Sequence, residues 1–174
     1  MIRFLFFLLS IALLSCRAEK TKESNNKKWG TAHSVDFNQE LNAREGLKIK
    51  LFLAHHRELK LLATESESGL RFMKYCIGSG EVLAQEGQEA IVRVKIELLD
   101  GRVCYETAKD EVERVIIAKS EKETGIHEAL QLMRKGDKAK VILPSYLGHG
   151  LLGDRMKIPP QSVLYIDIQL IDLN

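Results

Sequence analysis

The chain has 174 residues, 45% of them hydrophobic, which is enough for one domain and a short additional segment. Its 26 Lys and Arg residues nearly balance its 24 Asp and Glu residues, and the formal net charge is +2. This balance argues against a nucleic-acid partner, because such binding normally requires a basic patch.

The first residues have the pattern of a bacterial secretory leader. Arg3 precedes an apolar stretch at residues 4–14, interrupted only by Ser10, and this stretch is too short to span a bilayer as a mature helix. It ends in Leu-Leu-Ser-Cys, which resembles a lipobox, the motif whose cysteine is lipidated and becomes the new N-terminus. We expect residues 1–15 to be a signal peptide and Cys16 to carry a lipid anchor. The alternative is an ordinary cleaved leader followed by a chance cysteine.

Two further segments precede the expected domain. Residues 16–37 begin with a polar, lysine-rich run and are predicted to be a solvated tether between the lipid and the domain. Residues 38–63 are predicted to be a helical lead-in, although Gly46 interrupts the pattern. The apolar positions that partly share one helical face are Leu41, Ile49, Phe52, Leu53 and His56. This helix could cover its own domain, which is the simpler hypothesis, or pair with a second copy.

Segments with strand composition lie on both sides of one short helix. Strands are expected at residues 59–64, 70–77, 91–98, 102–106 and 112–118, and later at 139–143 and 164–170. Asp100-Gly101 is a hairpin signal, and Pro144 ends a strand because proline cannot donate to a ladder. These strands predict a mostly antiparallel α+β domain over residues 64–174, with the helix packed on one face of the sheet.

The helix is predicted from one apolar stripe. Its members fall at helical spacing from residue 126 onwards: Ile126, Ala129, Leu130 and Met133. Thr124 is expected to cap the helix, and Gly136 to take the positive φ that often follows a helix end. A glycine-rich loop at residues 145–161 separates the last two strands.

The order of motifs in this region carries a resemblance. Gly-Ile-His-Glu-Ala-Leu at 125–130, Gly-Asp-Lys-Ala at 136–139, Ile-Pro-Pro at 158–160 and the final strand resemble the back half of an FKBP-type peptidyl-prolyl isomerase domain. The run Leu-Pro-Ser-Tyr-Leu-Gly-His-Gly-Leu-Leu-Gly-Asp at 143–154 is also similar to FKBP-type lipoproteins associated with gliding motility in Bacteroidota. The resemblance implies an FKBP-like curved antiparallel sheet wrapped around one short helix.

The resemblance also implies a chemistry that needs no cofactor. Rotation about an Xaa–Pro bond is slow because amide resonance must be broken, with a barrier near 20 kcal/mol. Family members lower that barrier in a shallow apolar pocket between the sheet, the helix and the long loop. Carried over by position, the catalytic candidates are His149, as a hydrogen-bond donor, and Tyr105, at the rim. The corresponding substrate-binding residues are Val94, Cys104, Ile126, Ile158 and Ile166.

Several of these positions depart from the family pattern. Most family aromatic residues are replaced, for example by Val94, Ile126 and Ile166, and Glu113, Lys122 and Glu123 also stand at family ligand positions. Because aromatic rings supply much of the contact area of a small pocket, their loss should weaken proline binding. Val94, Ile126 and Ile166 could also simply be core residues, with His149 a solvated loop residue.

Three functional hypotheses follow. The first is an isomerase that assists the folding of envelope or exported proteins, with proline-containing polypeptides as clients. The second is a catalytically weak or silent chaperone or scaffold with the same fold. The third is an accessory lipoprotein of a secretion or gliding machinery. All three place the protein in the cell envelope, with a lipid anchor in the membrane, and we expect the outer membrane, facing the periplasm.

Metal binding is not expected from the sequence. His55 and His56 are adjacent, so on a helix they point about 100° apart and make a poor ligand pair. An oxidising envelope would permit a disulfide between Cys76 and Cys104. If Cys104 lines the pocket, as the resemblance implies, both thiols should be free.

Overall fold

The structure is a computed structural model that describes residues 31–174, with side chains from residue 34 onwards. The predicted signal peptide, Cys16 and the tether up to residue 30 lie outside the described residues. Phe37–Asn174 forms one compact unit. None of the helices in the described part of the chain combines the length and the apolar character needed to cross a membrane.

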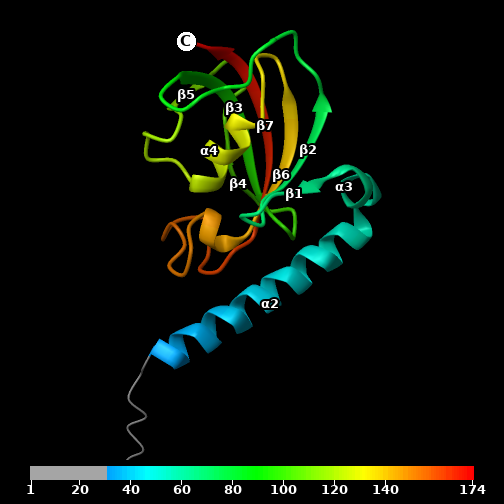
Figure 1. The fold of residues 1–174 in the computed structure, drawn as a ribbon, viewed down its shortest axis with the longest axis vertical. Helices are drawn as coiled ribbons and strands as arrows, with labels where there is room; N and C mark the ends of the chain where they lie inside the picture. Colours follow the sequence, from blue (N-terminus) through cyan, green and yellow to red (C-terminus); the bar gives the residue numbers. More distant parts are fainter. Residues whose placement is uncertain (1–30) are drawn as a thin grey trace, which may run out of the picture. The chain divides into compact units, whose positions relative to one another are not determined.

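The unit is built on a seven-stranded antiparallel sheet (Figure 1). The strands are β1 (Thr64–Glu65), β2 (Arg71–Cys76), β3 (Glu89–Leu98), β4 (Val103–Glu106), β5 (Glu113–Ile116), β6 (Lys138–Leu143) and β7 (Leu164–Leu173). Their order across the sheet is β1-β2-β6-β7-β3-β4, and β5 also pairs with β3. The helices are α2 (Thr31–His55), α3 (Arg57–Leu62) and α4 (Thr124–Gln131), with a short 3-10 helix η1 (Ser145–Leu147). The predicted mostly antiparallel α+β architecture, with one short helix packed on the sheet, is confirmed.

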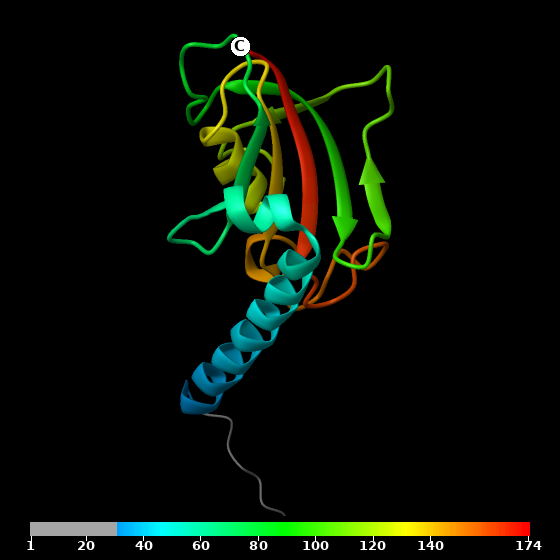
Figure 2. The same cartoon turned by 90° about the vertical axis from the view of Figure 1, so that its right-hand side faces the viewer.

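The main core lies between α4 and one face of the sheet (Figure 1, Figure 2). Alternate residues of β3 are buried from Ala90 to Leu98, as strand periodicity requires. Ile96 pairs with Ile166 of β7, and both pack in the same cluster as Ile126 of α4. Burying each such side chain stabilises the fold by about 1.5–3 kcal/mol, so this layer fixes α4 against the sheet.

A second, smaller cluster fixes the lead-in helix to the domain. Ile49 of α2 is buried against Ile142 and Val163. Phe52 stacks on His56, with ring centroids 3.9 Å apart, and also meets the ring of Tyr165. The predicted helical lead-in is therefore confirmed, and its predicted apolar face packs on its own domain.

The lead-in differs from the prediction in its extent. The helix begins at Thr31 rather than at residue 38, and it continues through Gly46 without a break. A Cβ added at Gly46 would meet nothing within 4 Å, so the glycine is not required by crowding there. Leu47 and Leu51 stay exposed on α2. Pairing with a second copy through this helix stays a prediction.

The predicted strand at residues 59–64 is wrong, because residues 57–62 form α3. The backbone N–H of Lys60 donates to the carbonyl of His56, and that of Ala63 to Leu59, at 3.0 Å each. Leu59 is the buried residue of this turn. A short apolar run fits one helical turn as well as a strand, and here packing of Leu59 decides for the helix.

The predicted cap at Thr124 is also wrong. Glu123 occupies the N-cap position without a side-chain cap, and Thr124 is already helical. The preceding loop is held instead by the buried His127. Its Nδ1 accepts the backbone N–H of Ala118 at 3.0 Å, and its Nε2–H donates to the carbonyl of Ser120 at 3.1 Å. The helix start is thus positioned by a residue inside the helix.

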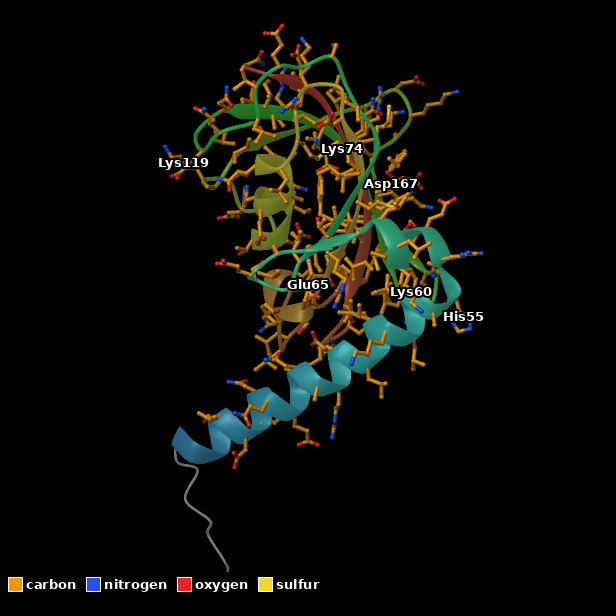
Figure 3. The ribbon with its side chains drawn as sticks, turned by 45° about the vertical axis from the view of Figure 1, so that its right-hand side comes forward. His55, Lys60, Glu65, Lys74, Lys119 and Asp167 are labelled. Carbon is orange, nitrogen blue, oxygen red and sulfur yellow. The ribbon has the colours of Figure 1, made fainter. Side chains whose placement is uncertain are left out.

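The turn after α4 is held by a buried ion pair. Asp137 is fully buried and lies 2.6 Å from the Nζ of Lys74, a β2 residue labelled in Figure 3. Its Oδ1 accepts the backbone N–H of Gly78 at 2.7 Å.

Two glycines are required at this turn. Gly136 has the predicted positive φ, +88°. A Cβ added at Gly78 would lie 2.2 Å from the carbonyl oxygen of Lys135. The two chain segments therefore approach too closely for any side chain at Gly78.

Candidate active site

A cavity of about 570 Å³ opens between the sheet, the segment before α4 and the loop after η1. Its lining comes from four parts of the chain: Val94 and Ile96 of β3, Tyr105 and Glu113 of β4 and β5, residues 121–123, and Gly148, His149, Asp154 and Met156 of the loop. The two β3 side chains point inward by strand alternation and form an apolar floor. The remaining wall is largely polar.

His149 is tied to Glu123 across the cavity wall. Its Nε2 lies 2.9 Å from Oε1 of Glu123. Because a carboxylate only accepts, Nε2 carries the hydrogen of this bond. A neutral His149 then presents Nδ1 as an acceptor, and it can donate to a substrate carbonyl only as an imidazolium.

Tyr105 is tied to Asp154 in a similar way. The Tyr105 hydroxyl donates to Oδ2 of Asp154, and the backbone N–H groups of Met156, Lys157 and Ile158 donate to Oδ1 at 2.8–2.9 Å. Burial opposes ionisation of Asp154, but these bonds outweigh it and lower its pKa to about 2. The same hydroxyl bond, with burial, raises the pKa of Tyr105. Asp154 is therefore an anion at neutral pH, and its hydrogen bonds organise the loop.

A third polar pair lies at the side of the cavity near β5. The Nζ of Lys122 lies 2.6 Å from Oε2 of Glu113, and the Thr107 hydroxyl donates to Oε1 of Glu113 at 2.6 Å. Burial works against ionisation of Glu113, but both bonds favour the anion and its pKa is lowered. Lys122 and Glu113 thus neutralise each other at the cavity.

The structure divides the residues predicted from the sequence into two groups. Val94, Tyr105 and His149 line the cavity. The other four do not line it and are at most 3% exposed: Cys104, Ile126, Ile158 and Ile166. Ile126 and Ile166 border a gap between α4 and the sheet that has no room for a water molecule. Their role in binding substrate stays a prediction, and in this structure they are core residues.

Five lining residues were missed by the sequence analysis: Ile96, Glu121, Gly148, Asp154 and Met156. Ile96 had a usable signal, because it lies two residues after Val94 on the same face of β3. Asp154 had none, since its partner Tyr105 is 49 residues away in the sequence. The chemistry of the wall thus depends on contacts that spacing alone does not reveal.

A second cavity, of about 640 Å³, lies beside β3 and β7 and has a different character. Most of its lining side chains are polar or charged: Tyr75, Arg93, Lys95, Glu106, Thr107, Lys109, Lys138, Asp167 and Gln169, with Val94 and Ala108 between them. Figure 3 labels Asp167 on β7, where it accepts the hydroxyl of Tyr75 at 2.8 Å. The second cavity lacks a continuous apolar floor, so it is less suited than the first to burying a proline ring.

The described residues contain no group of three or more His, Cys, Asp or Glu side chains placed to hold a metal ion. Nδ1 of His55, labelled in Figure 3, bonds the carbonyl of Leu51, and that of His56 bonds Phe52. Cys76 is exposed and Cys104 buried, and both thiols are free. Burial raises the pKa of Cys104, which makes it a poor nucleophile.

The sequence that builds this fold and cavity matches a known family. Residues 80–171 match the sequence model described as FKBP-type peptidyl-prolyl cis-trans isomerase. This match covers more than half of the chain, and the protein belongs to that family.

Named relatives support the assignment. The chain is 29% identical over 168 residues to the macrophage infectivity potentiator of Trypanosoma cruzi, covering 97% of this chain and 81% of that protein. It is 30% identical over 144 residues to the FKBP-type peptidyl-prolyl cis-trans isomerase FkpA of Buchnera aphidicola subsp. Schizaphis graminum, covering 82% of this chain and 55% of the relative. The chain therefore spans little more than half the length of that relative.

A solved structure shows the same fold. The crystal structure of a peptidyl-prolyl cis-trans isomerase from Pseudomonas syringae pv. tomato aligns with a TM-score of 0.61 at 23% identity. The alignment covers 72% of this chain and 90% of that one.

Proposed function

We propose that this FKBP-type isomerase assists the folding of envelope or exported proteins by binding their prolyl segments in the cavity floored by Val94 and Ile96. The observation that carries the proposal is the position of this cavity. It lies between the sheet, the start of α4 and the long loop, and it brings two apolar side chains together with Tyr105 and His149.

The chemistry follows from removing the amide from water. A planar amide is stabilised by charge separation, which water solvates and an apolar floor does not. When a proline ring lies over Val94 and Ile96, the amide that precedes it loses that solvation. The twisted amide then costs less free energy relative to the planar amide. No nucleophile or cofactor takes part in such a rotation.

Hydrogen-bond donation is a small part of this mechanism. The Tyr105 hydroxyl donates to Asp154, and the Nε2–H of His149 donates to Glu123. Only protonated His149 retains a further ring N–H for a substrate carbonyl. Tyr105 is also the one Phe, Tyr or Trp side chain among the residues that line the cavity. We therefore expect turnover that depends on desolvation and is slower than in relatives with aromatic pockets.

The isomerase proposal is tested with the full chain and a short Xaa–Pro peptide in exchange NMR spectroscopy. Accelerated cis–trans exchange that saturates with peptide supports it. Exchange at the spontaneous rate, with binding to the cavity retained, would instead favour a chaperone without turnover.

One observation favours that chaperone alternative. Leu151, Leu152 and Met156 of the cavity loop are 51%, 65% and 82% exposed. Exposed apolar side chains on one loop can hold unfolded segments. This second function would be established if the protein suppresses client aggregation even without peptide turnover. The suppression should be lost when Leu151 and Leu152 are replaced with Ser. An accessory role in a secretion or gliding machinery stays a prediction.

The envelope location rests on the sequence pattern before the domain. The apolar residues 4–14 and the lipobox-like ending at Cys16 support export and lipidation. Labelling cells with a radioactive fatty acid, for the native chain and Cys16→Ser, tests this directly. Label and outer-membrane fractionation that both depend on Cys16 support the proposal, and a native chain without label contradicts it.

A further inference from the structure

The cavity wall carries more negative than positive charge. Its carboxylates are Glu113, Glu121, Glu123 and Asp154. The one lysine that lines it, Lys122, is paired with Glu113 at 2.6 Å, so this charge is cancelled locally. Lys157, which is not a lining residue, places its Nζ 4.9 Å from the centre of the Tyr105 ring. Among the described residues, Glu121, Glu123 and Asp154 form no ion pair with a lysine or arginine, and Glu123 is paired with His149.

Glu123 has an unfilled hydrogen-bonding position. Its side chain is only 8% exposed, and Oε1 bonds His149. Oε2 is buried and has no hydrogen-bond partner among the residues that the structure describes. An unpaired buried carboxylate oxygen is costly, so a ligand donor would be stabilised by this carboxylate once rotation of the Glu123 side chain turns Oε2 toward the cavity. This observation is independent of the charge count and points to a donor on the ligand.

The other polar groups of the wall do not donate to Oε2 of Glu123. The Tyr105 hydroxyl donates its hydrogen to Asp154, and both oxygens of Asp154 already accept hydrogen bonds. Glu121 is exposed and adds negative charge at the mouth. The cavity thus offers an apolar floor on one side and negative charge on the other.

We propose that the cavity selects prolyl peptides in which lysine or arginine precedes the proline, with the proline ring over Val94 and Ile96 and the cation at Glu123. The inference rests on the proposed function and names its substrate class. The preceding residue is chosen because its carbonyl belongs to the rotating bond, which holds its side chain beside the ring. An ammonium or guanidinium group can share the Glu123 carboxylate with His149, whereas an acidic neighbour is repelled.

The test measures binding and isomerisation separately, with the full chain. Three peptides, Ala-Xaa-Pro-Ala with Xaa as Lys, Met or Glu, are titrated by calorimetry and followed by exchange NMR. Methionine serves as an uncharged side chain of similar length. The lysine peptide should bind about tenfold more tightly than the methionine peptide, and the glutamate peptide most weakly. The preference should shrink in high salt.

Matched variants locate the effect. Glu123→Gln should reduce the lysine preference to about threefold or less. Glu86→Gln removes the same charge from an exposed residue outside the cavity and should leave the preference unchanged. Glu121→Gln, at an exposed position, should reduce the preference partly and remains informative if Glu123→Gln does not fold.

The outcomes separate this inference from the proposed function. Equal binding of the lysine and methionine peptides overturns the inference, and turnover of the methionine peptide would still support the isomerase. A preference that survives both Glu123→Gln and Glu121→Gln also overturns it. Lysine preference without turnover supports the inference and removes the isomerase proposal. Absence of binding to all three peptides overturns both.

Discussion

Glu45 of α2 binds Ser145, one hundred residues further along the chain. Its Oε2 accepts the Ser145 backbone N–H at 2.9 Å, and its Oε1 accepts the Ser145 hydroxyl. Glu45 is 2% and Ser145 1% exposed. The carbonyl of Ser145 in turn accepts the backbone N–H groups of Gly148 and Gly150, on either side of His149. The lead-in helix therefore contacts the base of the loop that carries the cavity wall.

Replacing Glu45 should destabilise the domain. Glu45→Ala leaves a buried N–H and hydroxyl without acceptors, so the free energy of unfolding should fall by about 1–3 kcal/mol. Urea denaturation followed by circular dichroism measures it. Glu40→Ala is the control, because Glu40 pairs with Arg44 on the surface of the same helix and should cost less than about 1 kcal/mol. Equal losses in the two variants would contradict a structural role for the Glu45–Ser145 contact.

The stability of the domain should depend on Asp154 in acid. The pKa of Asp154 is about 2 in the fold against an ordinary value of 3.8, so the folded state favours the anion. Its contribution is fully present above pH 4 and is lost as the pH falls through about 2. Thermal unfolding from pH 2 to pH 6 should therefore show a shallower loss of stability for Asp154→Asn than for the native chain. Asp110→Asn, at an exposed position, should follow the native curve; parallel curves for all three would refute this assignment.

A tryptophan should not fit at Ile126, a position where the family resemblance implies an aromatic residue. Ile126 is 1% exposed and borders a gap without room for water between α4, Val141 and Ile166. Ile126→Trp should overpack this layer and lower the free energy of unfolding by about 1–3 kcal/mol. Ile126→Leu, which conserves volume, should cost less than about 1.5 kcal/mol. Unchanged stability of the tryptophan variant with faster peptide turnover would show that this layer opens into the cavity.

The two described thiols should differ strongly in reactivity. Cys76 is exposed, whereas Cys104 is 3% exposed and its pKa is raised by burial. Alkylation of the native protein, read by peptide mass spectrometry, should modify Cys76 at once and Cys104 only on unfolding. Rapid modification of both under native conditions would mean that Cys104 faces the cavity. A disulfide between them would contradict the structure.

Much of the sheet could be predicted from local patterns. The alternation along β3 and β7 places every second residue in the core, so the sequence alone indicates which face is buried. The stripe of α4 from Ile126 onwards is equally local. The short apolar run at residues 59–64 was misassigned because one turn of helix and a short strand have nearly the same pattern there.

The polar wall of the cavity could not be predicted in this way. His149 meets Glu123 across 26 residues, and Tyr105 meets Asp154 across 49 residues. These contacts depend on how the loop folds over the sheet, and the periodic spacing of apolar residues does not predict that arrangement. The family resemblance pointed to Val94, Tyr105 and His149, which line the cavity. It could not show that Tyr105 and His149 donate hydrogen bonds to neighbouring carboxylates.

The binding site for prolyl segments is tested most directly by titrating an isotope-labelled chain with Ala-Lys-Pro-Ala and following the backbone amide signals. We predict that the largest shifts occur at the cavity, at Val94, Ile96, Tyr105, Gly148 and His149. Signals of Tyr75, Arg93 and Lys138, in the second cavity, should move much less. Shifts concentrated at those three residues, or on α2 alone, would contradict the assignment of the site.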